Sequence, residues 1–472
     1  MAELHDLTAL EQAAAVRAGE ISPVELVDHY LARIEAHSDT VGAYVTVTAE
    51  QARAAAKAAE QAVRDGRDTG DLPPLHGVPV SVKDLNLTRG VRTTFGSTAY
   101  AEFVPPVDDH VVELLAAAGT ISLGKTNTPE FGLPCYTEPD VAPPARTPWD
   151  LSRGAGGSSG GAAASVAAGL APFAQGSDGG GSVRIPASVC GLVGLKVSRG
   201  RISNGPVGGD TTGLAWSGPL ARTVADAAAL LDAMAVPQPG DPHWAPPPDE
   251  PFLAATRREP GRLRVARYAE PVIPAPVHPD CLAAWEDASR LLAELGHEVV
   301  DVPQPLTPEL VPLFETLWAA GAAGIPVDPA MEDGLRPLTR WLRERGRALS
   351  APRFLSALSG LQFASRQAIR DTMAFDAVLT PTLAQPPAPV GSIRDDADPA
   401  ADFEAQKRFT PFTSAYNMTG QPAISLPLYW TEGGLPIGVM LVGRPAGEAA
   451  LLSLAAQLEA ARPWRDRHPA LW

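Results

Sequence analysis

Two clusters rich in glycine and serine are the most informative part of this sequence: Gly156-Gly157-Ser158-Ser159-Gly160-Gly161 and Gly176-Ser177-Asp178-Gly179-Gly180-Gly181-Ser182-Val183-Arg184-Ile185-Pro186. A flexible linker is glycine and serine throughout, whereas an alanine-rich segment suited to a buried helix, residues 162–170, separates these clusters. The second cluster then leads into an apolar segment, residues 190–195. Glycines that admit close backbone approach, interleaved with hydroxyls and held between ordered elements, indicate a polar reaction site rather than a tether.

The length and charge of the chain limit its class. At 472 residues it exceeds the usual size of one domain, so one large α/β domain and two domains are both compatible with its length. Its net charge is −16 with no long basic run, which argues against nucleic acid as a partner because phosphate binding needs clustered lysine and arginine. Lysine occurs only at positions 57, 83, 125, 196 and 407, so a tunable amine is scarce in this chain.

The sequence gives no signal for a disulfide framework, a metal site or a membrane segment. Its three cysteines, Cys135, Cys190 and Cys281, are odd in number and lack metal-ligand spacing. No histidine pair has the H-E-x-x-H spacing of a zinc site. The N-terminus has no apolar signal core, and no run approaches the ~20 apolar residues that span a bilayer. We therefore expect a soluble cytoplasmic protein without metal or other cofactor.

Strand and helix patterns alternate through the first half of the chain. Ser22-Pro23-Val24-Glu25 has the form of a capping box and predicts the start of a helix. Residues 78–82 predict a short strand with Lys83 at its carboxyl end, and residues 120–123 predict the next strand. Further helices are expected over residues 49–63, 111–118 and 223–234. This alternation favours an open sheet covered on both faces.

The second half of the chain returns to strands after a helical region. A proline-rich break over residues 237–251 is expected to be a surface connection rather than a domain boundary. We predict strands at residues 263–268, 297–302, 376–380, 423–427 and 436–442, a helix at 280–295, and a helical region at 308–362.

The stretch from Gly156 to Lys196 resembles the signature of the amidase signature family of serine hydrolases, which use a Ser-Ser-Lys triad. The family carries its lysine at the end of an earlier strand, where this chain has Lys83, and its two serines match Ser158 and Ser182. The resemblance extends from about Leu7 to Trp464. It implies an α/β amidase signature fold, with a mixed twisted central sheet covered by helices on both faces.

The same resemblance implies a single domain over residues 1–472. Within it, residues 1–70 are expected to form N-terminal helices and residues 71–235 the catalytic core. Residues 236–365 are expected to be variable and mostly helical, and residues 366–472 to return to the sheet.

The resemblance assigns chemical roles within the triad. Ser182 is expected to be the nucleophile, and Ser158 to relay its proton to Lys83. Lys83 can act as a base only when neutral, so its surroundings must lower the pKa of its amine. The backbone N–H groups of Gly179, Gly180, Gly181 and Ser182 are expected to form an oxyanion hole. Many family members carry a larger residue where Gly179 stands, but its N–H is retained.

The residues beside the triad have structural interpretations. Ser159 is expected to make a local backbone hydrogen bond, and Asp178 and Arg184 to form an ion pair or to anchor the glycine loop. Gly156 to Gly160 also matches the G-x-S-x-G nucleophile elbow, which defines a rival, an α/β-hydrolase esterase with Ser158 as nucleophile. That elbow requires a preceding apolar strand, and residues 147–153 do not have that pattern.

The resemblance also suggests which amide is cleaved. Leu133, Cys135, Tyr136, Ile185 and Trp216 are expected to line the substrate pocket, and their apolar or aromatic character favours an apolar or aryl amide. The main alternative is a glutaminase like that of the glutaminyl-tRNA-forming amidotransferase, which works with partner subunits and tRNA and usually has glutamine where Ile185 stands.

Two further segments, residues 201–206 and 420–425, are similar to bacterial amidases of the 6-aminohexanoate-cyclic-dimer hydrolase type. We therefore expect an amidase that hydrolyses linear or cyclic amides through an acyl-enzyme on Ser182. Its partner is expected to be a small-molecule amide, without nucleic acid or membrane, and the sequence is compatible with a homodimer.

Overall fold

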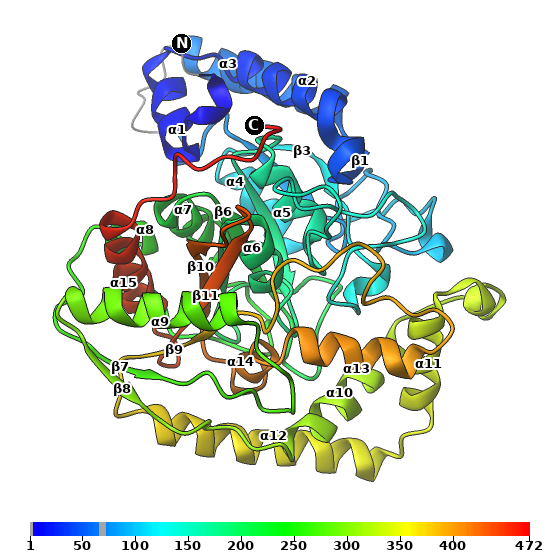
Figure 1. Cartoon of the computed structure of the whole chain (residues 1–472). Coiled ribbons are helices and arrows are strands. Elements are labelled where there is room, and N and C mark those ends of the chain that lie inside the picture. The colour runs from blue at the N-terminus through cyan, green and yellow to red at the C-terminus, as the bar shows by residue number, and fades with distance from the viewer. Residues whose placement is uncertain (1–2, 66–71) are drawn as a thin grey trace.

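The computed structural model of the protein describes residues 3–65 and 72–472. Within these residues, eleven strands form one sheet in the spatial order β1-β3-β2-β4-β6-β5-β10-β11-β9-β7-β8 (Figure 1). The strands are β1 (Tyr44–Val47), β2 (Pro79–Lys83), β3 (Ile121–Thr126), β4 (Phe173–Asp178), β5 (Val193–Lys196), β6 (Trp216–Ala221), β7 (Arg264–Arg267), β8 (Glu298–Asp301), β9 (Ala377–Pro381), β10 (Ala423–Trp430) and β11 (Pro436–Gly443). The expected boundary at residues 70 and 71 lies outside the described residues.

The sheet contains both strand orientations. Strand β2 pairs in parallel with β3 and β4, whereas β4 pairs antiparallel with β6 and β10 pairs antiparallel with β5 and β11. This arrangement confirms the predicted α/β fold with a mixed central sheet. Because β2 and β4 are parallel neighbours, their carboxyl ends lie at the same edge of the sheet.

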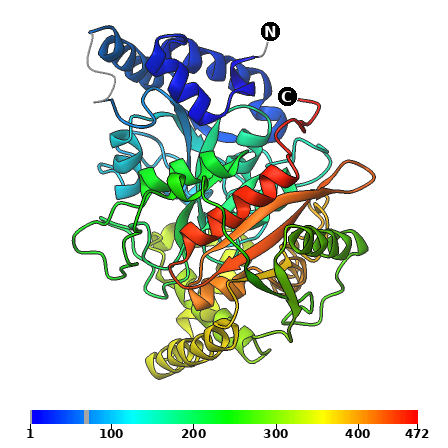
Figure 2. The same ribbon diagram turned by 90° about the vertical axis from the view of Figure 1, so that its left-hand side faces the viewer.

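Helices cover both faces of the sheet because successive side chains of a strand point to opposite faces. In β11, Val439 and Leu441 pack into one hydrophobic cluster, whereas Met440 and Val442 pack into another. The first cluster is covered by α1 (Ala9–Ala18), α4 (His110–Ala117), α7 (Val224–Met234), α8 (Phe252–Ala255), α9 (Pro279–Glu294) and α15 (Glu448–Ala461). Figure 2 shows α15, in red, lying against the orange strands β10 and β11.

The opposite face carries the remaining helices in two groups. Helices α2 (Pro23–Val41), α3 (Ala49–Arg64), α5 (Gly160–Ala167) and α6 (Arg184–Cys190) contribute to a cluster beside β3 and β4. Helices α10 (Leu310–Gly324), α12 (Ala351–Thr372) and α14 (Ser414–Thr419) pack beside β9 and β11. Helix α11 (Pro337–Arg347) packs against α10 and against α13 (Pro399–Phe409). None of the helices in residues 3–65 and 72–472 has the length and apolar character needed to span a bilayer.

Most elements expected from the sequence are present, with shifted ends. Helix α2 begins after Ser22 with the predicted capping box, and the strand expected at 120–123 continues to Thr126 as β3. The helical region expected at 308–362 is divided into α10, α11 and α12, the last of which continues to Thr372. Strands β4 and β6 were not predicted, because their glycine and polar residues hide the apolar alternation of a strand.

The close packing of α5 against its neighbours generates the first prediction. A methyl group at Gly161 would overlap backbone atoms of Asn127 and Ala43, whereas Gly321 in α10 has open space around it. Gly161→Ala is expected to lower the free energy of unfolding by about 1–3 kcal/mol through overpacking. Gly321→Ala is the matched control and is expected to raise it by up to about 1 kcal/mol through helix propensity. Urea unfolding of both variants measures this, and equal stability of the two would contradict the packing described.

Candidate active site

The active-site candidates lie at the edge where β2 and β4 end. In the parallel register, Ser81 pairs with Ala174 and Val82 with Gln175, so Lys83 ends its strand beside the last residues of β4. The backbone N–H of Lys83 also donates to Oε1 of Gln175 at 3.0 Å. The sheet therefore fixes the position of Lys83 relative to the loop that follows β4.

Lys83 is fully buried and is held by hydroxyl groups. Its Nζ donates to Ser158 Oγ at 2.8 Å and to Ser177 Oγ at 3.0 Å. Burial lowers the pKa of Lys83 to about 7, although the negative charge of Asp178 opposes this shift. The amine can therefore be neutral near neutral pH and accept a proton from Ser158.

The loop carrying Ser158 lies against the backbone of Ser182. The N–H of Ser159 donates to the carbonyl of Ser182 at 3.1 Å. The hydroxyl of Ser159 donates to the carbonyl of Ser177 at 3.1 Å and accepts from its N–H at 3.2 Å, which ties the loop to β4. The peptide bond between Gly157 and Ser158 is cis. The structure thus brings Lys83, Ser158 and Ser182 to one place, with Ser182 at a cavity and Lys83 buried.

A buried ion pair shapes the loop between β4 and α6. Asp178 and Arg184 are both fully buried, and two charge-assisted hydrogen bonds of 2.9 Å join the guanidinium to the carboxylate. Burial alone would raise the pKa of Asp178, but Arg184 holds it well below its usual range. Asn417 donates to Asp178 Oδ1 at 2.8 Å, and Arg184 also donates to the carbonyl of Thr413. The pair therefore anchors the loop that joins β4 to α6, and it also ties this loop to α14 through Thr413 and Asn417.

The glycine loop differs from the expected oxyanion hole at one position. The N–H of Gly181 donates to Asp178 Oδ1 at 2.8 Å, so it is not available to a substrate. In the described part of the chain, the N–H groups of Gly179, Gly180 and Ser182 make no hydrogen bond. Gly181 has φ 131° and lies against Thr413, so the loop requires glycine there. Gly181 therefore shapes the loop, and the other three N–H groups are the candidate donors.

Ser182 opens into an apolar cavity of about 710 Å³, counting the space at its mouth. Leu133, Cys135 and Ile185 line this cavity, as expected. Tyr136 does not line it: its ring is buried and its hydroxyl donates to Asp402 at 2.6 Å.

Trp216 does not line the cavity either. It lies in β6 opposite Asp178, and its ring packs into the cluster on the other face of the sheet, edge-on to His243. The alternation of side chains along β6 directs it away from Ser182.

Much of the cavity wall comes from segments that the sequence did not single out as pocket. These lining residues are Val272, Ile273, Val311, Phe314, Trp318, Phe403, Gln406, Lys407, Thr410, Pro411, Ser414 and Met418. One signal could have found part of this wall, because Phe314 and Trp318 are four residues apart and so share one face of α10.

Two further lysines are buried near the site. Lys125 forms an ion pair with Asp84 at 3.7 Å and donates to Thr93 at 3.1 Å, so Asp84 does not pair with Lys83. Lys196 donates to the carbonyl of Val197 at 2.7 Å, and burial, reinforced by Arg184, lowers its pKa to about 7. Lys83 differs from both because its amine contacts the hydroxyl of Ser158.

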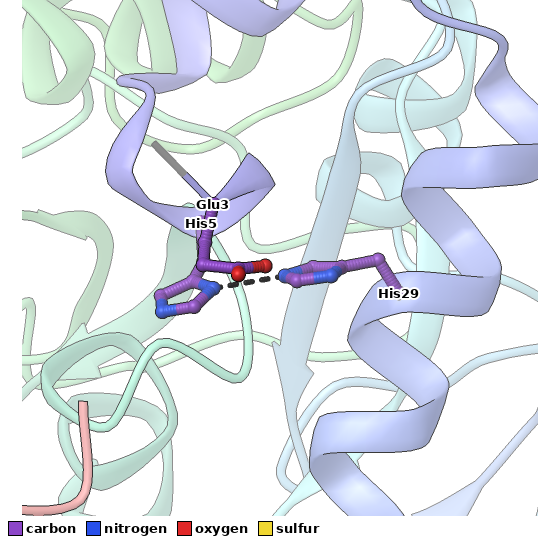
Figure 3. A group of neighbouring side chains, drawn as sticks. All are labelled: Glu3, His5 and His29. Carbon is purple, nitrogen blue, oxygen red and sulfur yellow. Dashed lines mark hydrogen bonds between the residues drawn. The ribbon is translucent and has the colours of Figure 1, made fainter. Parts of the chain in front are cut away.

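Among the described residues, one group of side chains has the donor set of a metal site. Figure 3 shows Glu3, His5 and His29 at the N-terminal helices. Two imidazoles and a carboxylate are ligands that zinc accepts. Nδ1 of His5 and Nε2 of His29 already share a hydrogen bond of 2.9 Å, and burial together with the nearby Arg33 lowers the pKa of His5 to about 4. The ring of Trp472 lies edge-on to His5, so this group lies where the two ends of the described chain meet.

A buried amine, two serines and backbone N–H groups that make no hydrogen bond among the described residues thus lie together beside an apolar cavity. The chain belongs to the amidase family, whose model, described as Amidase, matches residues 25–452. It is therefore an enzyme that hydrolyses the C–N bonds of amides.

Individual relatives agree with this assignment. The chain is 36% identical to an acylamidase of Rhodococcus erythropolis, with 99% of this chain and 98% of the relative covered. It is 38% identical to a glutamyl-tRNA(Gln) amidotransferase subunit of Synechococcus sp. (strain WH7803), with 94% of each covered. A solved structure of 6-aminohexanoate cyclic dimer hydrolase complexed with substrate superposes with a TM-score of 0.92 at 34% identity, covering 99% of this chain and 100% of that one. The expected similarity to hydrolases of that type is confirmed.

The buried ion pair generates a prediction on stability. Asp178→Asn leaves the guanidinium of Arg184 buried without a counter-charge, so we expect the free energy of unfolding to fall by about 3–5 kcal/mol. The control is Asp28→Asn, which breaks the half-exposed pair between Asp28 and Arg53 and is expected to cost less than about 1 kcal/mol. Urea unfolding compares the two variants. Equal losses in both would show that the buried pair does not hold the loop.

Proposed function

We propose that the protein is a free-standing amidase that hydrolyses amides carrying an apolar or aryl group, through an acyl-enzyme on Ser182. One observation carries this proposal: the hydrogen-bonded pair of Lys83 and Ser158 is buried beside Ser182, which itself opens into an apolar cavity. A nucleophile needs a base within hydrogen-bond reach, and in this proposal Lys83 serves Ser182 through Ser158, whose Oγ accepts a hydrogen bond from its amine.

The first half of the reaction forms the acyl-enzyme. The hydroxyl oxygen of Ser182 attacks the amide carbon while its proton passes to Ser158, and the proton of Ser158 passes to the neutral amine of Lys83. The carbonyl oxygen becomes an oxyanion and accepts hydrogen bonds from the N–H groups of Gly179, Gly180 and Ser182. The C–N bond then breaks as Lys83, through Ser158, returns the proton to the departing nitrogen.

The second half uses the same groups in reverse. A water molecule attacks the acyl carbon, and its proton passes through Ser158 to Lys83. The ester bond to Ser182 breaks, the proton returns to the serine oxygen, and the carboxylic acid leaves. Lys83 is again neutral, so the cycle needs no other proton donor.

The cavity supports a free-standing amidase rather than a component of an amidotransferase. Ile185 lies beside Ser182 in the wall, where an apolar side chain offers no partner to the amide of glutamine. The similarity to an amidotransferase subunit of Synechococcus sp. is the observation that supports the alternative function. A site with a buried donor or acceptor strongly rejects a substrate that lacks the counterpart, whereas an apolar pocket accepts many shapes with modest preference.

The esterase alternative, with Ser158 as nucleophile, has less support. Ser158 is 2% exposed and accepts a hydrogen bond from Lys83, whereas Ser182 lines the cavity. The residues before Ser158 are turns and bends rather than the strand that a nucleophile elbow requires.

The pKa of Lys83 generates a prediction on pH dependence. Above about pH 7 the amine is neutral and can accept a proton, and below that value it is protonated and cannot. We expect kcat/KM for an uncharged amide to rise with pH through about 7 and then to level off. Lys83→Met is expected to lower kcat/KM by at least about a hundredfold, the usual contribution of a general base. A flat profile from pH 5 to 9 in the wild-type enzyme would contradict the assignment of Lys83 as base.

The proposed function is tested with the purified chain alone, without partner subunits or tRNA. We expect it to hydrolyse acetanilide and other hydrophobic anilides and to release little ammonia from glutamine. Ser182→Ala is the control, and it should lose essentially all turnover while retaining the melting temperature of the wild type. A fluorophosphonate adduct should map to Ser182 in the wild type. Activity on glutamine only, and only with tRNA and partner subunits present, would favour the amidotransferase.

A further inference from the structure

Two glycines before the nucleophile are not explained by backbone conformation. Gly181 has a positive φ of 131°, which favours glycine. Gly179 and Gly180 do not have a positive φ, so their backbone conformation also tolerates other residues. Their N–H groups would also be retained by larger residues. A steric reason for glycine at these positions therefore depends on the space that a side chain would fill.

An aromatic pair on α10 occupies that space. A Cβ atom at Gly179 would lie 3.3 Å from the indole ring of Trp318, and one at Gly180 would lie 3.5 Å from the ring of Phe314. The first distance is tighter than an ordinary carbon contact and the second is an ordinary one. Trp318 therefore lies directly on Gly179, and Phe314 on Gly180, beside the candidate oxyanion donors.

The two rings form a flat wall of the cavity. Phe314 and Trp318 are stacked, with ring centroids 5.3 Å apart and an interplanar angle of 21°. Both line the cavity together with Ser182, and both remain partly exposed, so part of their ring surface faces the cavity. Leu317, which lies between them in the sequence of α10, is fully buried in the core. Its burial sets the rotation of α10, so that the two rings face the cavity.

Among the described residues that line the cavity, no cation is left unpaired beside these rings. Lys407 lines the cavity, but its Nζ lies 2.5 Å from carboxylate oxygens of both Glu315 and Glu404. Glu315 belongs to α10 and Lys407 to α13, so the pair also joins the helices on either side of the cavity. Because Lys407 is already paired with two carboxylates, it offers no free positive charge to an anionic group of a substrate.

We propose that Trp318, together with Phe314, is a specificity-determining residue that selects amides with a flat, uncharged ring, and that Gly179 is glycine because it makes room for Trp318. This inference rests on the proposed function, since it concerns the same cavity. Aromatic rings stacked on a flat partner gain more than their buried area alone supplies. A saturated ring of the same size buries comparable area but cannot stack in this way.

The first test compares matched substrates on the purified full chain. One pair differs in the acyl group, benzamide against cyclohexanecarboxamide, and the other in the amine, acetanilide against N-cyclohexylacetamide. Trp318→Leu keeps an apolar side chain but removes the flat surface. In one of the two pairs, we expect it to lower the ratio of kcat/KM for flat over saturated substrate by about two- to tenfold. Phe363→Leu, which alters an exposed aromatic residue of α12, is the control and should leave both ratios unchanged.

The outcomes separate the inference from the proposed function. If wild type and Trp318→Leu both hydrolyse the amides with the same ratios in both pairs, the inference is wrong and the amidase proposal stands. If the wild type hydrolyses none of the four, both are overturned. Circular dichroism melting of each variant shows whether a lost ratio reflects misfolding, because Trp318→Leu should melt as a folded protein.

A double-mutant cycle tests the match between the glycine and the ring. Gly179→Val should lower kcat/KM for the flat substrate by about tenfold or more, because its side chain displaces Trp318. In a Trp318→Ala background the contact with the indole is removed and only the Cβ of Ala215, also 3.3 Å away, remains, so the same substitution should cost clearly less. Equal costs in the two backgrounds would show that Gly179 does not make room for Trp318.

Discussion

The burial of one amine against a serine hydroxyl is the constraint on which this site depends. Lys83 is taken out of water at the end of β2, and its Nζ donates to Ser158 Oγ at 2.8 Å. In the described part of the chain no ion pair joins Lys83 to a carboxylate, so burial disfavours its charged form. The parallel pairing of β2 with β4 holds this amine beside the loop that carries Ser182.

Two neighbouring buried groups, the carboxylate of Asp178 and the amine of Lys83, differ in whether they keep their charge near neutral pH. The carboxylate of Asp178 keeps its charge because Arg184 and three backbone or amide donors surround it, and it shapes the glycine loop. Lys83 lacks such a partner and loses its charge near neutral pH. A rigid, charged anchor and a neutral base thus lie within one short segment of the sheet edge, which separates the positioning of the loop from the transfer of protons.

The sequence predicted the parts of the site that local patterns encode. The strand ending at Lys83, the serines in the glycine clusters and the pairing of Asp178 with Arg184 could all be expected from neighbouring residues. It could not show that the N–H of Gly181 is taken by Asp178, because that depends on how the loop folds back. It also placed Trp216 in the pocket, whereas the register of β6 directs that ring to the other face.

The wall of the cavity could not be predicted for a different reason. It combines α10 and α13 with the loop before α5, and only tertiary packing brings these distant segments together. Trp318 lies in the helical region expected at residues 308–362, but its contact with Gly179, more than a hundred residues earlier in the chain, depends on how α10 packs. The lining of the cavity therefore depends on the packing of helices, whereas the position of Lys83 beside the glycine loop depends on the edge of the sheet.

An NMR titration of protein labelled with ¹⁵N at the lysine side chains measures directly whether the amine of Lys83 is neutral near pH 7. The chain has only five lysines, so Lys83→Met assigns the signal by its disappearance. We expect a midpoint near 7 for that signal. A midpoint near 10.5, the ordinary value for lysine, would contradict it.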